Sequence, residues 1–204
     1  HAGAFNNYDP MGAYRLVTQH KKVIKIHIER LTGAYYCQDC DIIRIDFNCK
    51  HNNFNENHIL VEGGRNRFHS VKNGLKKVDS GVIVIIHDGV RPLISKDLIE
   101  RLVAKNKKGS GVIPIMPIKN SIRKIDRGTS SHINRKNIYH VQTPQCFIST
   151  DIKNAYELEL VERFTDDASV LENAGGKITT VLGEEENIKI TTKQDLKIAE
   201  LFMQ

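Results

Sequence analysis

An unbroken apolar run, Val82 to Ile86, is followed by His87 and an acid, Asp88, and three positions later by a guanidinium, Arg91. A run of this kind is typical of a strand that is buried on both faces. A carboxylate and a cation at the end of such a strand suit a phosphorylated substrate with a divalent metal. Taken alone, the two side chains are explained as well by a simple surface ion pair.

Polar residues of the same kinds follow other apolar runs. Gly63 and Gly64 come after "HILVE" and allow the backbone to approach a ligand, and Ser70 lies in the first turn of the helix that follows. Thr165 opens a helix together with two aspartates, and Lys189 is the one cation of "NIKITT". Each has an ordinary structural explanation. Together they place glycines, hydroxyls, an acid and cations at the strand ends of one sheet, a composition that suits a phosphorylated ligand.

The elements that position these residues alternate between strands and helices from residue 57 onward. Apolar patterns predict strands at 58–61, 81–88, 111–118, 177–183 and 187–192, and helices at 67–78, 95–106, 149–160, 165–175 and 192–202. The alternation predicts an α/β fold, a Rossmann-like, doubly wound, mostly parallel sheet that binds ligands at its carboxyl edge. We expect a single domain over 1–204. Before residue 57, only 23–28 and 41–47 alternate like strands.

Several residues predict where these elements begin and end. Ser95 and Thr165 are predicted N-caps, and Gly175 is a predicted helix terminator. Thr192 and Asp195 have the spacing of a capping box. Two prolines in the 111–118 strand, Pro114 and Pro117, predict an edge position or an early end of that strand.

The segment 118–141 is polar and basic and breaks the alternation. Its flanks, "SIRKI" and "IYHVQ", predict an antiparallel pair that forms a protruding β-arm. Three arginines, Arg123, Arg127 and Arg135, make a binding or dimer-forming role as plausible as an ordinary surface hairpin.

Composition narrows the class of protein. Thirty Lys and Arg against 24 Asp and Glu give a net charge of +6, which favours anionic partners, although a generally solvated basic surface explains it equally well. The absence of Trp argues against nucleic acid, and no segment has the apolar length of a membrane span. Four cysteines are too few for a disulfide framework, so we expect a cytoplasmic protein. Cys37, Cys40, Cys49 and His51 have the residue types of a zinc site, with free thiols as the alternative.

Six motifs, in this order, closely resemble the 2-C-methyl-D-erythritol 4-phosphate cytidylyltransferase family of the non-mevalonate isoprenoid pathway. They are "GGRNRFHSVKNGL", "VIIHDGVRPLI", "NSIRKI", "RKNIYHVQTPQCF", "FTDDASVLENAGGKI" and "NIKITTKQDLKIAE". The resemblance runs from about residue 57 to 204. It implies a homodimeric enzyme that uses magnesium and joins a cytidylyl group from CTP to methylerythritol phosphate, with release of pyrophosphate.

The resemblance also implies roles for single residues. Gly64 and Ser70, with Gly63 beside them, match positions that hold the cytosine and ribose end of CTP. Asp88 and Arg91 match the pair that faces substrate and metal, and Lys189 matches a phosphate contact that we expect to be catalytic. The remaining matches are expected to bind the substrate: Gly89, Ser121, Arg135, Thr143 and Thr165. Gly89 replaces the more common alanine, and Ser121 replaces threonine. Arg135 and Thr143 match residues that meet the sugar phosphate, often across the dimer interface.

Residues 1–56 depart from the family pattern. The family opens with a Gly-rich loop that carries an arginine and is followed by Pro-Lys-Gln, and these cradle the triphosphate of CTP. "MGAY" and "AFNNYDP" are only faint echoes of this. We therefore expect either a rebuilt or shortened start or a missing triphosphate loop. Two alternatives stay open: a ribitol-5-phosphate cytidylyltransferase and a catalytically silent nucleotide-binding homologue.

Overall fold

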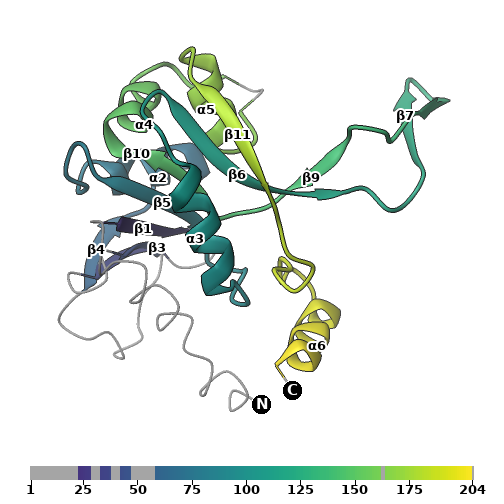
Figure 1. The fold of residues 1–204 in the computed structure, drawn as a ribbon, viewed down its shortest axis with the longest axis horizontal. Helices are drawn as coiled ribbons and strands as arrows, with labels where there is room; N and C mark the ends of the chain where they lie inside the picture. Colours follow the sequence, from purple (N-terminus) through teal and green to yellow (C-terminus); the bar gives the residue numbers. More distant parts are fainter. Residues whose placement is uncertain (1–22, 29–32, 38–41, 47–57, 162–163, 204) are drawn as a thin grey trace.

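The computed structural model describes residues 23–28, 33–37, 42–46, 58–161 and 164–203, which form one large sheet, a small hairpin and five helices (Figure 1). The first strands are β1 (Val23–Ile28), β2 (Gly33–Cys37), β3 (Ile42–Asp46), β4 (His58–Glu62) and β5 (Ile83–Asp88). The later strands are β6 (Ser110–Pro117), β7 (Ile122–Asp126), β8 (Thr129–Ile133), β9 (Tyr139–Val141), β10 (Gln145–Ile148) and β11 (Lys177–Leu182). The helices are α2 (Arg67–Leu75), α3 (Lys96–Lys105), α4 (Ser149–Tyr156), α5 (Asp167–Asn173) and α6 (Lys193–Phe202). None of them is long and apolar enough to cross a membrane.

The large sheet is mixed, with the strand order β11-β6-β10-β5-β1-β3-β2-β4. Its β1–β5, β1–β3 and β6–β11 pairs are parallel, as the alternation of strands and helices predicts. The α/β class is thus confirmed, but the sheet is not mostly parallel. β10 is inserted between β5 and β6 and runs antiparallel to both, because the chain returns from the arm in the opposite direction.

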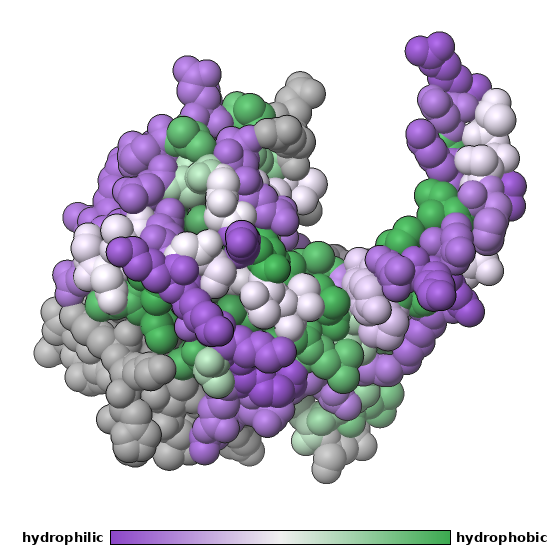
Figure 2. Space-filling model, turned by 45° about the horizontal axis from the view of Figure 1, so that its top comes forward, coloured by the Kyte–Doolittle hydropathy of each residue, from purple (hydrophilic) through white to green (hydrophobic). Residues whose placement is uncertain are grey.

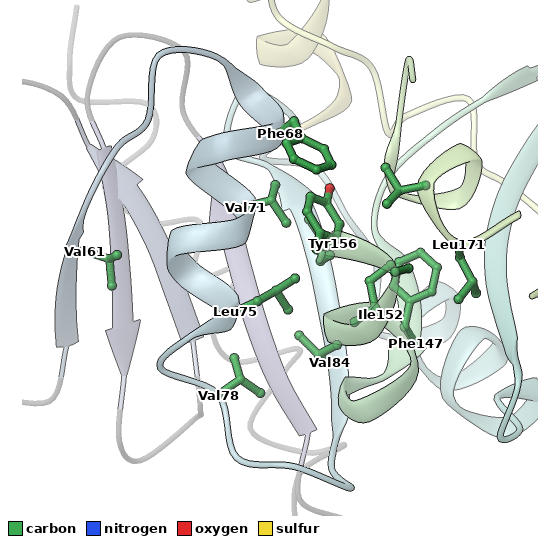
Figure 3. Packing of buried hydrophobic residues seen from close by; sticks show 13 residues of the cluster. Val61, Phe68, Val71, Leu75, Val78, Val84, Phe147, Ile152, Tyr156 and Leu171 are labelled. Atoms are coloured by element: carbon green, nitrogen blue, oxygen red, sulfur yellow. The ribbon is translucent and has the colours of Figure 1, made fainter. Parts of the chain in front are cut away.

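Strand β5 is buried along its whole length, and its side chains alternate between two apolar layers. Val84 and Ile86 pack with α2, α4 and α5 in the layer drawn in Figure 3. Ile83 and Ile85 pack against α3 in the other layer. Helices therefore cover both faces of the sheet around β5. The same alternation sends Asp88, two residues after Ile86, to the face that α2 covers.

Helix caps follow the sequence closely, with one exception. Ser95 accepts a hydrogen bond from the Leu98 amide, and Thr192 forms a complete capping box with Asp195. The predicted cap Thr165 is wrong: Asp166 is the N-cap of α5, and Ser169 completes its capping box. Asp166 takes this position because its carboxylate reaches the amide at N3, the usual geometry of a capping aspartate.

Two strand predictions are corrected. β6 is not at an edge, because β11 pairs with one side and β10 and then β9 pair with the other. It ends at Pro117, in keeping with the other alternative, an early strand end. Pro114 still uses its carbonyl, which accepts from the Gln142 amide at 2.9 Å. Residues 187–192 form no strand. The Ile190 amide donates to the carbonyl of Val90, in the turn after β5, at 2.8 Å, and this single bond does not make a ladder.

The predicted arm is present, but its strands pair differently. β7 pairs with β8 in a small separate hairpin that stands clear of the body, as Figure 2 shows. β9, which the sequence pattern paired with "SIRKI", instead pairs with β6 and extends the large sheet. The turn between β7 and β8 contains Gly128 at φ +81° and Arg127 at φ 47°. Left-handed backbone at two adjacent residues suits a tight hairpin, and the tight turn accounts for the change of partner.

The inserted strand gives a test of the core. Phe147 of β10 is fully buried, and its replacement by Ala should lower the free energy of unfolding by about 3–5 kcal/mol, because the cavity cannot close fully. Leu182 of β11 is 65% exposed, and Leu182→Ala should change stability by only about 0.5 kcal/mol. Urea unfolding measures both. Equal losses for the two variants would contradict the burial of β10.

Candidate active site

Asp88 lies at the carboxyl end of β5, where its buried carboxylate meets three cations. Lys189 Nζ lies 3.0 Å from Oδ2, and Arg91 Nε lies 3.6 Å from the same oxygen. Arg67 Nε, from the first turn of α2, lies 3.8 Å from Oδ1. The structure therefore brings together Asp88, Arg91 and Lys189, as the sequence predicts, and adds Arg67.

The turn after β5 is fixed by a threonine hydroxyl and a histidine. Thr143 Oγ1 accepts from the Asp88 amide at 2.9 Å and lies 2.9 Å from His87 Nδ1. His87 Nε2 lies 2.8 Å from the carbonyl of Arg91, which can only accept. In a neutral ring, Nε2–H thus donates to that carbonyl, and Nδ1 accepts from the Thr143 hydroxyl. Both hydrogen-bonding functions of Thr143 serve to hold the Asp88 backbone.

The three cations keep Asp88 ionised despite its burial. Burial raises the pKa of the carboxyl, but Arg67, Lys189 and Arg91 together outweigh this and hold the pKa below its usual value. Burial also lowers the pKa of Arg91, and Asp88 offsets that effect in part. A carboxyl pKa that is depressed in the folded state contributes stability above its unfolded pKa. That contribution is lost as the pH falls through the folded pKa.

Arg91 and Asn187 link this cluster to the segment that carries Lys189. Arg91 Nη1 donates to the carbonyl of Asn187 at 2.8 Å, and Asn187 Nδ2 donates to the carbonyl of Thr143 at 2.9 Å. Asn187 is fully buried. The segment 187–190 is therefore anchored to the end of β5 by side chains rather than by a strand ladder.

A pocket of about 450 Å³ opens beside this anchor. Its lining comes from the β5 turn, from β6 and β9 at the base of the arm, and from the segment 185–188: Arg91, Met116, Pro117, Lys119, Asn120, His140, Val141, Gln142, Glu185, Asn187 and Ile188. Among the described residues, Arg91 Nε and Asn187 Oδ1 are buried polar atoms without a hydrogen-bond partner. Two residues of the pocket lining thus carry buried polar atoms: Arg91 Nε, which faces Asp88 Oδ2 at 3.6 Å, and Asn187 Oδ1, which has no partner among the described residues.

The predicted nucleotide residues form a tight loop before α2. Ser70 Oγ accepts from the Gly64 amide at 2.9 Å and lies 3.0 Å from the carbonyl of Asn66. A Cβ on Gly64 would stand 2.3 Å from His69 Cβ and 2.7 Å from the His69 carbonyl carbon, so only glycine fits there. The buried Ser70 hydroxyl holds the loop closed, while Gly63 remains partly exposed next to it.

Within the described part of the chain, the remaining predicted residues make no ion pair or hydrogen bond with the Asp88 side chain. Thr165 is exposed before α5, where its amide donates to Ser169. Ser121 is exposed in the arm, and Arg135 is exposed and donates to the carbonyl of Lys119. Gly89 lies in the turn after β5, directly beside Asp88.

Two predictions concern residues outside the described part of the chain. The first is the zinc site of Cys40, Cys49 and His51, together with the side chain of Cys37. The second is the departure from the family pattern within residues 1–22. Where the structure does describe the chain, no group of three or more His, Cys, Asp or Glu residues is placed to hold a metal ion. The charged groups that the described residues place around Asp88 are cations.

Comparison with known proteins assigns the family. Residues 22–204 match the IspD family, described as 2-C-methyl-D-erythritol 4-phosphate cytidylyltransferase. The chain belongs to this family. The enzyme of that name from Azobacteroides pseudotrichonymphae genomovar. CFP2 is 46% identical over 158 residues, which cover 76% of this chain and 70% of the relative. The Bacteroides fragilis enzyme is 42% identical over 155 residues, covering 76% and 71%.

Solved structures agree with the assignment to the IspD family. The Francisella tularensis IspD structure superposes with a TM-score of 0.71 at 26% identity and covers 98% of this chain and 91% of that chain. The structure of the Thermus thermophilus enzyme gives a TM-score of 0.61 at 28% identity, covering 71% and 72%. The chain is thus a cytidylyltransferase that joins CTP and 2-C-methyl-D-erythritol 4-phosphate in isoprenoid synthesis. The ribitol-5-phosphate and silent alternatives gain no support from these matches.

Sequence reasoning missed three residues that contact or support the Asp88 cluster: Arg67, Asp167 and Asn187. Each lies inside a motif that points to the family, yet none is predicted as a site residue from its own pattern. Arg67 contacts Asp167 across 100 positions, and Asn187 contacts Thr143 across 44. The alternation along β5 is the one signal that predicts the face of Asp88, but it does not reveal which helix covers that face.

Thr143 gives a direct test of how the β5 turn is held. Thr143→Val removes the oxygen that pairs with the buried Asp88 amide, so it should lower stability by about 1–3 kcal/mol and also lower turnover. Thr143→Ser keeps the oxygen and should retain most of both. Urea unfolding and pyrophosphate release measure the two effects. If Val and Ser at this position behave alike, the hydroxyl does not hold the turn.

Proposed function

We propose that cytidylyl transfer takes place at the Asp88 cluster, with Lys189 and Arg91 as the cations that face the reacting phosphates. The observation that carries this proposal is one buried carboxylate with three cations around it, beside a pocket that Arg91 and Lys119 line. Asp88 holds Lys189 and Arg91 in place through Oδ2, while its Oδ1 faces Arg67.

Charge neutralisation is the main task of such a site. The nucleophile is a phosphate oxygen and the target is the α-phosphorus of CTP, so two anions must approach each other. A phosphate monoester is already largely ionised at neutral pH, and no protein group has to remove a proton from it. Lys189 and Arg91 lower the repulsion and stabilise the charge that moves to pyrophosphate. Positioning and cations suffice, without a protein nucleophile.

We further propose that the pocket beside Arg91 takes the polyol phosphate. Arg91 and Lys119 line it and suit the phosphate, and Asn187 Oδ1 suits a polyol hydroxyl. Thr143 shapes this pocket through the Asp88 turn, with Gly89 beside it. Gly63 and Gly64 would offer backbone to the cytosine and ribose end of CTP, with Ser70 holding that loop.

Magnesium fits this site mainly as a companion of the nucleotide. The IspD family generally uses Mg²⁺. Mg²⁺ is commonly held by one or two carboxylates together with substrate phosphates. Asp88 is one carboxylate in a positive surrounding, so it would supply one oxygen once phosphates are bound. The ion would add positive charge at the phosphates.

We also propose that the chain is a single nucleotidyltransferase domain spanning 1–204 and that the arm forms its dimer interface. Ser121 and Arg135 are exposed there, and so are the apolar side chains of Ile125, Tyr139 and Val141. The hairpin stands off the body that carries Asp88 (Figure 2). A second copy would cover these apolar side chains, and Arg135 and Ser121 would then reach the sugar phosphate in the partner, with Thr165 nearby.

Lys189 tests the transfer site. Lys189→Gln removes the positive charge that lies nearest to Asp88 and should lower kcat on the order of 10³-fold, with little change in stability because the side chain is 48% exposed. Lys197→Gln, an exposed change in α6, is the matched control and should leave turnover intact. Pyrophosphate release from CTP, magnesium and methylerythritol phosphate is the assay. Wild-type turnover in the Lys189→Gln variant would remove Lys189 from the site.

Mixed dimers test the shared site. Lys189→Ala and Arg135→Ala chains with different tags are expressed together, and the species that carries both tags is purified. If Arg135 acts in the partner's site, each mixed dimer has one intact site and one doubly defective site, so it should show about half of the wild-type turnover. Each variant alone should be nearly inactive. An inactive mixed dimer would place both residues in the same chain's site.

A further inference from the structure

We propose that Arg67 is a positioning residue of the transfer site, held by Asp167 and Tyr156 so that its Nε faces and orients the Asp88 carboxylate. This inference rests on the role proposed above for Asp88 and Lys189. It assigns a function to a contact between α2 and α5 that the transfer chemistry does not itself require.

Arg67 is held by a buried carboxylate through both terminal nitrogens. Nη1 donates to Asp167 Oδ1 at 2.9 Å, and Nη2 donates to Asp167 Oδ2 at 2.6 Å. This two-pronged contact fixes the plane of the guanidinium. It leaves Nε as the remaining edge, and Nε is the atom that lies 3.8 Å from Asp88 Oδ1. One rigid group thus bridges two carboxylates on different elements.

Asp167 is itself locked by a third donor. The hydroxyl of Tyr156, at the end of α4, donates to Asp167 Oδ1 at 2.5 Å, and both residues are buried. Burial and Asp167 raise the pKa of Tyr156 well above its usual value, so it stays a donor. Its ring stacks on Phe68, the neighbour of Arg67, with ring centres 4.6 Å apart, as Figure 3 illustrates. Three helices therefore set the position of one guanidinium.

The orientation of Asp88 follows from this arrangement. Its Oδ1 is drawn toward Arg67 on the α2 side, which leaves Oδ2 for Lys189 at 3.0 Å and Arg91 at 3.6 Å. Without Arg67 the carboxylate is free to rotate toward the other two cations. Lys189 is half-exposed and long, so a shift of its anchor moves its ammonium group away from the reacting phosphates. Arg67 acts through Asp88, without touching substrate.

The test must separate positioning from helix packing, because Arg67→Met alone leaves Asp167 buried without its cation and risks unfolding. The double variant Arg67→Met/Asp167→Asn removes both charges together and keeps an acceptor for Tyr156. We expect it to fold and to lose kcat on the order of 10²-fold, with KM for both substrates nearly unchanged. Arg67→Lys keeps one positive charge and should have an intermediate kcat.

A matched control joins α2 to the end of α4. Lys72 of α2 pairs with Glu157, which follows α4, at 3.1 Å, and this pair is separate from the ion pairs of Asp88 described above. Lys72→Met/Glu157→Gln should keep wild-type kcat. A wild-type kcat in the Arg67→Met/Asp167→Asn variant, or a loss no greater than in this control, would overturn the inference. Asp88→Asn is assayed in parallel: if it also keeps full turnover, the proposed function itself fails, whereas an inactive Asp88→Asn variant confines the failure to Arg67.

Discussion

The burial of one ionised carboxylate, that of Asp88, is the constraint on which this structure depends. A carboxylate with 12% of its side chain exposed is stable only when cations or donors replace the water it has lost. Here the cations come from three separate segments: α2, the turn after β5 and the segment 187–190. Pairing the charge therefore ties together regions that are distant in sequence, and it gathers positive charge where phosphates react.

The antiparallel strand β10 serves the same constraint. If β5 and β6 were direct parallel neighbours, nothing from residues 142–146 would lie beside the end of β5. Because β10 enters between them, Thr143 meets the Asp88 amide, and Gln145 donates to Asp166 at 2.8 Å and accepts from the Ala168 amide at 2.9 Å. The β5 turn and the start of α5 are thus held from one short strand. The mixed sheet is in this sense part of the site.

The sequence predicts the local features well and the long-range ones poorly. The apolar run before Asp88 and the caps at Ser95 and Thr192 are set by neighbouring residues, so pattern and capping rules find them. The four-residue strand β10 is not predicted, because its pairing depends on the path of the arm. The contact between Arg67 and Asp167 is not predicted either, because it depends on which helices share a face of β5. The family motifs compensate in part, since they contain residues whose roles no local rule reveals.

The exposure of the three cations suggests how the cluster responds to substrate. Asp88 and Asp167 carry two negative charges, and Arg67, Arg91 and Lys189 carry three positive ones, so the cluster holds a surplus positive charge that attracts phosphates. Arg67 is fixed by Asp167, and Arg91 is 12% exposed and bonded to the carbonyl of Asn187. Lys189 is 48% exposed and is the least constrained of the three. Because Lys189 pairs with Asp88 from a half-exposed position, it can follow the charge that develops on the phosphates, while the two arginines keep the carboxylate in place.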